Sequence, residues 1–405
     1  MIERRVWQRS YLPFLIALLS CVTGAGCGGS SSPQKIVTSG QNVQPISVNA
    51  GPISGQIYPN GVFTSVTICV PGTSTCQTIS GVLVDTGSFG LRIPSSLITI
   101  SLPEQSANNN AVGECYQFAD GSYLWGSVAT ADIKISGEQA SSVPVHLLNS
   151  NFFTLPTDCS SSGGPEENDP TSLGANGILG VGYLGADCGP ACASGSTPLS
   201  PFYYECSNSG CSPAFVAEAN QVTNPVTLFA TDNNGVIIEL PSVSGETASV
   251  SGSMVFGIGT QSNNALGSAT VFTVDPNTGN ISTNFNGVTY TNAAFLDTGS
   301  NGLYFLDGAI TGIPVCSDDP DFYCPGSTQN LSATNQGANG NSKSVNFSVG
   351  NADELLSTNN AAFPTLAGPN PGNFDWGLPF FYGRNVFTAI DGKSTPGGAG
   401  PYWAF

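Results

Sequence analysis

The sequence predicts a mainly all-β protein made of two similar lobes. Stretches rich in Val, Ile and Thr are interrupted by Gly and Pro, of which the chain has 50 and 28. No segment shows a long helical period, so strands and turns are favoured over helices. The length of 405 residues is large for one hydrophobic core. One phrase also occurs twice, as "LVDTGSFGL" at 83–91 and "FLDTGSNGL" at 295–303. Duplication of a lobe explains such a repeat.

The composition limits the partners of the protein. Lys and Arg total 9 against 27 acidic residues, which gives a net charge of −18 at neutral pH. Nucleic-acid binding needs clustered basic residues, so no nucleic-acid partner is expected, and an anionic membrane surface is an equally poor partner. The acidic excess either keeps the protein soluble or suits it to acidic surroundings.

The first residues predict an export signal. Arginines precede the apolar run "YLPFLIALLS" at 11–20, which is too short to span a membrane. The next segment, "GAGCGGSSSP" at 24–33, resembles a bacterial lipoprotein junction in which Cys27 carries the lipid. Cys21 is a rival lipid site because of the Leu three residues before it, and an ordinary secretory signal is the other alternative. We expect a membrane contact through the lipid anchor only.

The cysteines predict disulfide bonds. Cleavage before Cys27 leaves ten further cysteines, an even number that an exported chain can pair completely. We expect Cys69 to pair with Cys76, Cys316 with Cys324 and Cys115 with Cys159. The remaining four can pair locally or crosswise: Cys188, Cys192, Cys206 and Cys211. No metal or other cofactor is expected, because Cys-x-x-Cys is absent and the chain has a single histidine.

The chain divides into four segments. We expect a signal peptide at 1–26, a lipidated polar tether at 27–46, an N-terminal β lobe at 47–246 and a C-terminal β lobe at 247–405. The boundary between the lobes falls in a stretch rich in Ser and Gly, and each lobe then carries one Asp-Thr-Gly-Ser phrase.

The repeated phrase and three further segments resemble the pepsin-like aspartic peptidases. "FADGSYLWGSVAT" at 118–130 is similar to the flap hairpin of that family. "NGILGVG" at 176–182 and "FDWGLPFFYGRNVFTAID" at 374–391 are similar to the segments that pass beneath the two Asp loops. The resemblance covers about 55–392 and implies two β lobes related by a pseudo-twofold axis, with a cleft between them.

A closer resemblance is to a bacterial family of exported proteins of unknown function that carries the same phrases. It supports the fold and adds no activity. It is consistent with a protein that is lipid-anchored at the periplasmic face or the cell surface, or otherwise secreted.

The resemblance to pepsin-like enzymes implies that Asp85 and Asp297 form a catalytic pair. Two carboxyl groups in contact cannot both ionise cheaply, so such a pair shares one proton around a water molecule. One carboxylate then takes the proton of the water while the protonated one donates to the scissile carbonyl.

The loop residues after each Asp have supporting roles in this resemblance. The glycines let the two backbones approach closely. The serines can hydrogen-bond the carboxyl groups, and the threonines cross-link the loops through bonds from hydroxyl to backbone. The residues concerned are Thr86, Gly87, Ser88, Thr298, Gly299 and Ser300.

The sequence also departs from the family pattern. The flap residues are Phe118, Asp120, Gly121 and Ser122. Phe118 replaces the usual Tyr of the flap, and Arg92 stands where the family usually has Trp. Those two aromatic residues normally form a polar link, for which Tyr123 and Trp125 are the candidate substitutes here. In the second lobe, Asp375 stands where an apolar residue belongs.

The predicted function is that of an exported, monomeric aspartic endopeptidase that takes a peptide or protein substrate in the cleft between its lobes. The alternative is a catalytically weak or inactive relative that binds peptides or serves as a structural module at the cell surface. A glycosidase is disfavoured because equivalent loops suit a shared proton better than unlike acid and base groups. A Ser or Cys nucleophile lacks a base, since His146 is interpreted as structural.

Overall fold

The computed structural model describes residue 34 and residues 36–405. The predicted signal peptide at 1–26, and with it the lipid site Cys27, lies outside this part. Within it the chain forms 25 β-strands and only short helices, so the predicted mainly β class is confirmed. The helices are α1 (Pro170–Leu173), α2 (Pro190–Ala193), α3 (Gly308–Thr311), α4 (Ala352–Leu356), η1 (Ser95–Leu97), η2 (Glu218–Asn220), η3 (Pro225–Leu228) and η4 (Leu378–Phe381).

The larger of the sheets has 16 strands and draws on both halves of the chain. In spatial order it contains β11 (Gly210–Pro213), β10 (Tyr203–Ser207), β6 (Asn110–Gln117), β7 (Tyr123–Ile135), β8 (Glu138–Leu148), β4 (Phe89–Pro94), β9 (Ile178–Val181), β3 (Cys76–Asp85), β2 (Val62–Cys69), β1 (Val43–Val48), β13 (Val250–Phe256), β12 (Gly235–Leu240), β22 (Arg384–Ala389), β25 (Tyr402–Ala404) and β14 (Val271–Thr273), with β5 (Ser106–Ala107) beside β6.

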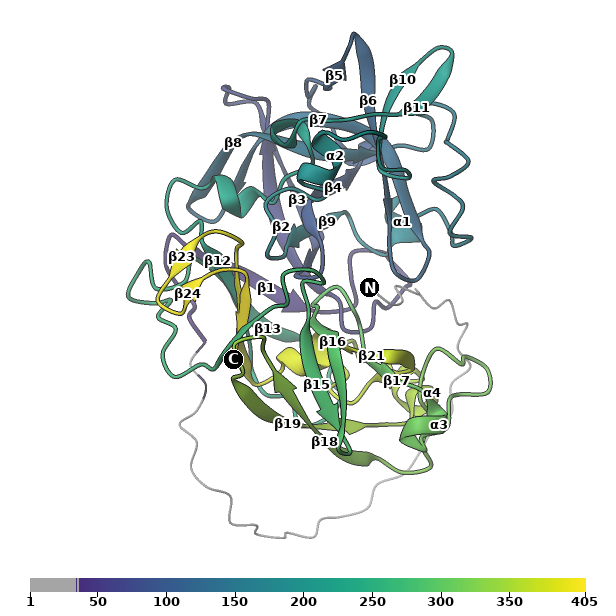
Figure 1. Ribbon diagram of the computed structural model, residues 1–405, viewed down its shortest axis with the longest axis vertical. Coiled ribbons are helices and arrows are strands. Elements are labelled where there is room, and N and C mark those ends of the chain that lie inside the picture. Colours follow the sequence, from purple (N-terminus) through teal and green to yellow (C-terminus); the bar gives the residue numbers. More distant parts are fainter. Residues whose placement is uncertain (1–33, 35) are drawn as a thin grey trace.

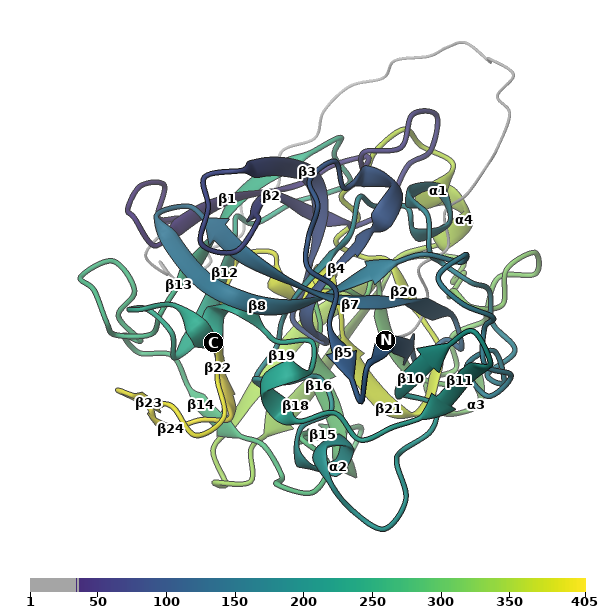
Figure 2. The same ribbon diagram turned by 90° about the horizontal axis from the view of Figure 1, so that it is seen from above.

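The smaller sheet has 7 strands, all from the second half of the chain. Its order is β19 (Ser342–Val349), β18 (Gln329–Gln336), β15 (Ile281–Phe285), β16 (Val288–Leu296), β21 (Asn370–Trp376), β17 (Leu303–Leu306) and β20 (Ala367–Gly368). A short ribbon joins β23 (Ser394–Thr395) to β24 (Gly398–Ala399). Figure 1 and Figure 2 both show this ribbon and the β10–β11 hairpin on opposite sides of the molecule.

The predicted lobe boundary at residue 246 lies in the connection between β12 and β13, which are neighbours in the larger sheet. Strand β13, which begins at Val250, pairs along its length with β1 and also with β12. The strands β22, β25 and β14 continue the same sheet. The sheet therefore runs across the predicted boundary, and β1, β12 and β13 lie between the upper and lower parts of the molecule in Figure 1.

Local sequence explains the hairpins. Strand β15 turns into β16 at Asn286 and Gly287, both with positive φ (51° and 82°), which is the turn that an Asn-Gly pair favours. Strands β2 and β3 form a hairpin, and their facing cysteines, Cys69 and Cys76, are joined by the predicted disulfide. From Thr64 to Ile68 the side chains of β2 alternate between buried and partly exposed, which fits one face turned to the core.

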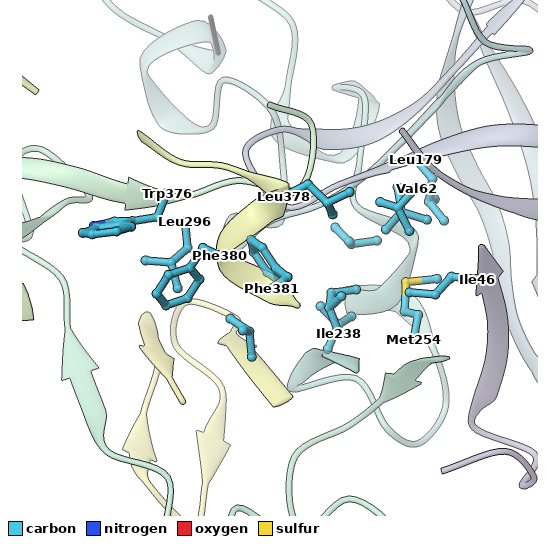
Figure 3. Close-up of a cluster of buried hydrophobic side chains, with 14 of the residues drawn as sticks. Ile46, Val62, Leu179, Ile238, Met254, Leu296, Trp376, Leu378, Phe380 and Phe381 are labelled. Carbon is cyan, nitrogen blue, oxygen red and sulfur yellow. The ribbon is translucent and has the colours of Figure 1, made fainter. Parts of the chain in front are cut away.

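The largest hydrophobic core is shared by the two sheets. Figure 3 shows Leu296 and Trp376 of the smaller sheet on one side and Ile46 and Val62 of the larger sheet on the other, with Phe381 of η4 between them. All of these side chains are buried. Because one close-packed core joins the two sheets, it fixes the distance between the strand ends of one sheet and those of the other.

Candidate active site

The repeated phrases form two loops with the same local topology. Asp85 is the last residue of β3, and Asp297 directly follows β16. Strand β3 lies parallel to β9, and the next strand, β4, runs antiparallel to β9. In the smaller sheet, β16 lies parallel to β21, and β17 runs antiparallel to β21. Each Asp is thus presented at the end of a strand by the same three-strand arrangement.

The two loops bring the carboxyl groups together. Asp85 and Asp297 are both fully buried, and a side-chain hydrogen bond links them. A Cβ atom added at Gly87 would lie 2.6 Å from Cγ of Asp297, and one at Gly299 would lie 2.7 Å from Cγ of Asp85. Neither glycine has a positive φ, so what these positions require is space for the opposite carboxyl group.

Two threonines cross-link the loops. The amide of Thr86 donates to Oγ1 of Thr298, and the amide of Thr298 donates to Oγ1 of Thr86, both at 3.0 Å. Each hydroxyl then donates to a carbonyl of the opposite loop, that of Leu296 at 3.2 Å and that of Val84 at 2.8 Å. Both threonines are buried, so the four bonds fix the relative position of the loops.

Each carboxyl group is also held by its own loop. Asp85 accepts from the amide of Gly87 at 2.8 Å and from the hydroxyl of Ser88 at 2.6 Å. In the second loop the amide of Gly299 and the hydroxyl of Ser300 bond the carboxyl group at 2.7 and 2.8 Å. These contacts leave the carboxyl groups little freedom to rotate.

The electrostatics of the pair favour a bound proton. Burial raises the pKa of Asp297 well above its usual range, and the negative charges of Asp85 and Asp375 raise it further. Burial also raises the pKa of Asp375 to about 7, although its hydrogen bond with Ser300 acts in the opposite direction. Carboxyl groups that exchange a proton at such short range can act as an acid and a base toward one molecule between them.

The predicted flap residues lie in the turn between β6 and β7. The amide of Phe118 donates to the carbonyl of Ser122 at 2.8 Å, and Gly121 has a φ of 86°. Asp120 accepts from the amide and the hydroxyl of Ser122, at 2.8 and 2.7 Å. Asp120 and Ser122 therefore shape the turn, and Phe118 packs edge-on against Tyr116 with ring centroids 5.2 Å apart.

The expected substitutes for the missing flap link lie elsewhere. Tyr123 and Trp125 belong to a cluster around the Cys115–Cys159 disulfide, and Nε1 of Trp125 donates to the carbonyl of Phe153. They form no part of the cluster that contains Phe118.

Tyr116, on β6 before the flap turn, lies close enough to Asp85 for the two groups to interact electrostatically. Burial raises the pKa of its hydroxyl, the charge of Arg92 opposes this, and the charge of Asp85 adds to it. The ring of Tyr116 also lies beneath the guanidinium of Arg92. Sequence reasoning missed Tyr116 because it stands two residues before the expected flap position. The one signal in the sequence was a tyrosine close to Phe118 along the chain.

Arg92 is the centre of a buried ionic cluster. Its guanidinium donates to the Phe89 carbonyl of the first Asp loop at 2.5 Å, to Glu114 at 2.9 Å and to Asp187 at 2.8 Å. Burial raises the pKa of Asp187 well above its usual range, and the neighbouring Glu114 adds to this. His146 is fully buried 3.2 Å from Glu114, and burial lowers its pKa to about 4. Burial thus disfavours the charged form of this interior residue.

The ten described cysteines form five disulfides, so the predicted pairing is confirmed where one was stated. The four cysteines whose pairing was left open pair locally. The bridges are Cys69–Cys76, Cys115–Cys159, Cys188–Cys192, Cys206–Cys211 and Cys316–Cys324. Such a set is typical of proteins in an oxidising, extracytoplasmic compartment.

The possible metal ligands in the described part do not make a metal centre. The one close group there consists of Cys316, Cys324 and Asp353, and its two cysteines are joined in a disulfide. Oxidised sulfur offers no thiolate to a metal ion. None of the helices in residues 34 and 36–405 is long and apolar enough to cross a membrane.

Fold and site together define a mainly β, disulfide-bonded protein with a hydrogen-bonded pair of buried carboxyl groups. A family model described as "Protein of unknown function (DUF3443)" matches residues 38–405, and the chain belongs to this family. This agrees with the resemblance to a family of unknown function. No curated protein matches the chain. The family description names no activity.

Proposed function

We propose that the chain is an exported aspartic-type endopeptidase with a pepsin-like fold of two lobes. The observation that carries the proposal is the hydrogen-bonded pair of Asp85 and Asp297 at the ends of two loops with the same topology. The cross-link of Thr86 with Thr298 supports it, because it fixes the two carboxyl groups without holding them apart.

In the proposed reaction a water molecule lies between the two carboxyl groups. The ionised carboxylate removes a proton from the water, and the oxygen attacks the carbonyl carbon of the peptide. The protonated carboxyl group donates its proton to the carbonyl oxygen, which gives a tetrahedral intermediate. The carboxyl group that took the proton from the water then protonates the amide nitrogen, and the C–N bond breaks. One hydroxyl of the intermediate returns its proton to the pair as the carboxylic acid product forms, so the pair again holds one proton. No covalent intermediate with the protein, no cofactor and no histidine takes part.

The substrate is proposed to be a peptide or protein bound between the lobes of a monomer. The high content of acidic residues, 27 against 9 basic residues, suits an enzyme that works where such groups are partly protonated. A protein without a peptidase activity is the second candidate. The observation in its favour is Phe118, which offers no hydroxyl at the flap position.

The direct test is incubation of the purified mature protein with a mixed peptide library between about pH 3 and pH 8. A pair of carboxyl groups gains and loses its shared proton within this range. Cleavage products identified by mass spectrometry would support a peptidase. The Asp85→Asn protein is the control, because the variant keeps the shape of the side chain and removes its proton exchange. Cleavage that persists in this variant would contradict the proposal. Binding of peptides without cleavage would favour the second candidate.

The lipid anchor is a proposal that rests on the sequence junction at 24–33. We propose that Cys27 carries the lipid and tethers the folded part to a membrane outside the cytoplasm. Intact-mass measurement of protein extracted from membranes tests this, since a diacylglyceryl group adds a defined mass to a chain that begins at Cys27. An unmodified chain that begins at another residue would contradict it.

A further inference from the structure

Asp375 is a third buried carboxyl group beside the pair. It lies on β21, is fully buried, and its Oδ2 is 2.6 Å from Oγ of Ser300. The same Ser300 oxygen is 2.8 Å from Oδ2 of Asp297. The other oxygen of Asp375, Oδ1, is buried and has no hydrogen-bond partner among the residues that the structure describes.

The count of hydrogen atoms limits the charges of these groups. A serine hydroxyl has one hydrogen, so it can donate to only one of two carboxylates. If Asp297 and Asp375 were both ionised, one of the two short contacts of Ser300 would join two oxygens without a hydrogen between them. One of the two acids must therefore carry a proton and donate it to Ser300.

The environment assigns this proton to Asp375. An ionised carboxylate with a buried, unpartnered oxygen is costly, whereas a protonated acid needs only the one acceptor that Ser300 supplies. Asp297, in contrast, accepts from the amide of Gly299 as well as from Ser300. Burial raises the pKa of both acids, and the proton that Asp297 holds is the one that it shares with Asp85.

The first loop has no such acid. Residue Phe295, two positions before Asp297, stands opposite Asp375 on β21. In the larger sheet Leu83, two positions before Asp85, stands opposite Ile178 on β9. The apolar Ile178 thus takes the place that the acid takes in the second loop, and the two otherwise similar loops differ at this position.

We propose that Asp375 is a positioning residue of the carboxyl pair, which as a neutral acid donates to Ser300 and so commits the Ser300 hydroxyl to Asp297. The proposal deepens the proposed function and rests on it for its effect on catalysis. The hydrogen bond from Asp375 to Ser300 strengthens the one from Ser300 to Asp297, because each hydrogen bond polarises the next. It thereby makes the two carboxyl groups of the pair inequivalent.

Loss of the proton from Asp375 would undo this arrangement. The titratable groups that face it are Asp297 and Asp85 on the two loops, together with Tyr304, its direct neighbour on β17. An ionised Asp375 would draw the Ser300 hydrogen to itself and add a negative charge beside the pair. We therefore expect catalysis to weaken as Asp375 ionises.

Two substitutions test the hydrogen-bond donor of Asp375 and its negative charge separately. Asp375→Asn keeps a neutral hydrogen-bond donor at every pH, and we expect kcat/KM within about twofold of the wild type near pH 5 and above the wild type beyond pH 7. Asp375→Leu removes the donor, and we expect about a tenfold or greater loss of kcat/KM at every pH. Asp353→Asn, at an exposed acid on α4, removes one charge elsewhere and should match the wild type. Equal losses in the Asn and Leu variants near pH 5, or no difference between Asn and wild type at any pH, would overturn the proposal.

A second measurement needs no activity. The pKa of Asp375 is raised in the folded state, so the folded protein binds the extra proton, and the stability it brings is present below the unfolded pKa near 4 and lost as pH rises through about 7. The urea midpoint of the wild type should therefore fall relative to Asp375→Asn between these limits. A constant difference between the two proteins would show that Asp375 holds no proton and overturn the proposal. A wild type that cleaves no peptide would contradict the proposed function, and this second measurement would still decide the state of Asp375.

Discussion

The guanidinium carbon of Arg92 lies 3.7 Å from the centre of the Tyr116 ring. This stacking joins β4, which follows the first Asp loop, to β6, which leads into the flap turn. Arg92 also donates to the loop carbonyl of Phe89. A cation over an aromatic ring thus connects the first Asp loop to the strand that leads into the flap turn.

Arg92→Lys should weaken this connection. Lysine keeps the charge but cannot stack as a plane or reach two carboxylates at once, so Glu114 and Asp187 would lose partners in a buried site. We expect the free energy of unfolding to fall by about 3 kcal/mol, measured by urea denaturation. Arg384→Lys is the matched control, because Arg384 also stacks on a ring but donates to a backbone carbonyl. Equal effects at both positions would contradict the role assigned to the buried carboxylates.

Asn at Asp85 or at Asp297 should abolish peptide cleavage, because neither the acid nor the base alone completes the proposed reaction. Each variant is expected to lose at least about 10³-fold in kcat/KM, and the double variant should lose little more than either single one. Steady-state kinetics of the three variants decide this. Additive losses would show that the two carboxyl groups act independently.

Thr86→Val should lower stability more than the loss of one ordinary hydrogen bond. The substitution removes a hydroxyl that donates to the Leu296 carbonyl and accepts from the Thr298 amide, and it leaves both backbone groups buried without partners. We expect a cost of about 2 to 4 kcal/mol in the free energy of unfolding. Thr67→Val, where the hydroxyl meets Thr78 at the surface, should cost under about 1 kcal/mol. A double-mutant cycle with Thr298→Val should reveal coupling, and its absence would contradict the cross-link.

Gly299→Ala should drive the carboxyl groups apart, because its new Cβ would lie 2.7 Å from Cγ of Asp85. The protein should remain folded, while kcat falls with a smaller change in KM. The control is Gly245→Ala, where the added Cβ meets nothing within 4 Å. A fully active Gly299→Ala variant would show that close approach of the carboxyl groups is not required.

The disulfides should differ in their contribution to stability. The bridge between Cys115 and Cys159 spans 44 residues, and the loop-entropy relation predicts about 4 kcal/mol for it. The bridge between Cys188 and Cys192 spans 4 residues, for which the same relation predicts about 2 kcal/mol. Alanine pairs at both bridges, compared by thermal denaturation, test the order. A larger loss from the short bridge would contradict it.

The sequence predicted the strands, the stated cysteine pairs and the two loops, because each depends on neighbours along the chain or on a phrase written twice. It could not predict the Arg92 cluster, since Glu114 and Asp187 stand in unrelated segments that only the folded structure brings to one point. Asp375 was recognised as a misplaced charge, but its contact with Ser300 depends on the side chains that β21 and the second loop turn toward each other. The sequence could not predict the pairing of β13 with β1 either, because this is a contact between residues far apart in the sequence.

The threonine cross-link has a consequence for the order of events during synthesis and export. Thr86 obtains its partners only when Thr298 and Leu296 are in place, and these residues are produced long after the first loop. A chain that is still incomplete therefore lacks the second carboxyl group of the pair and the threonine that positions it. Under the proposed function, the protein therefore cannot cleave peptides before the second loop has been made and joined to the first.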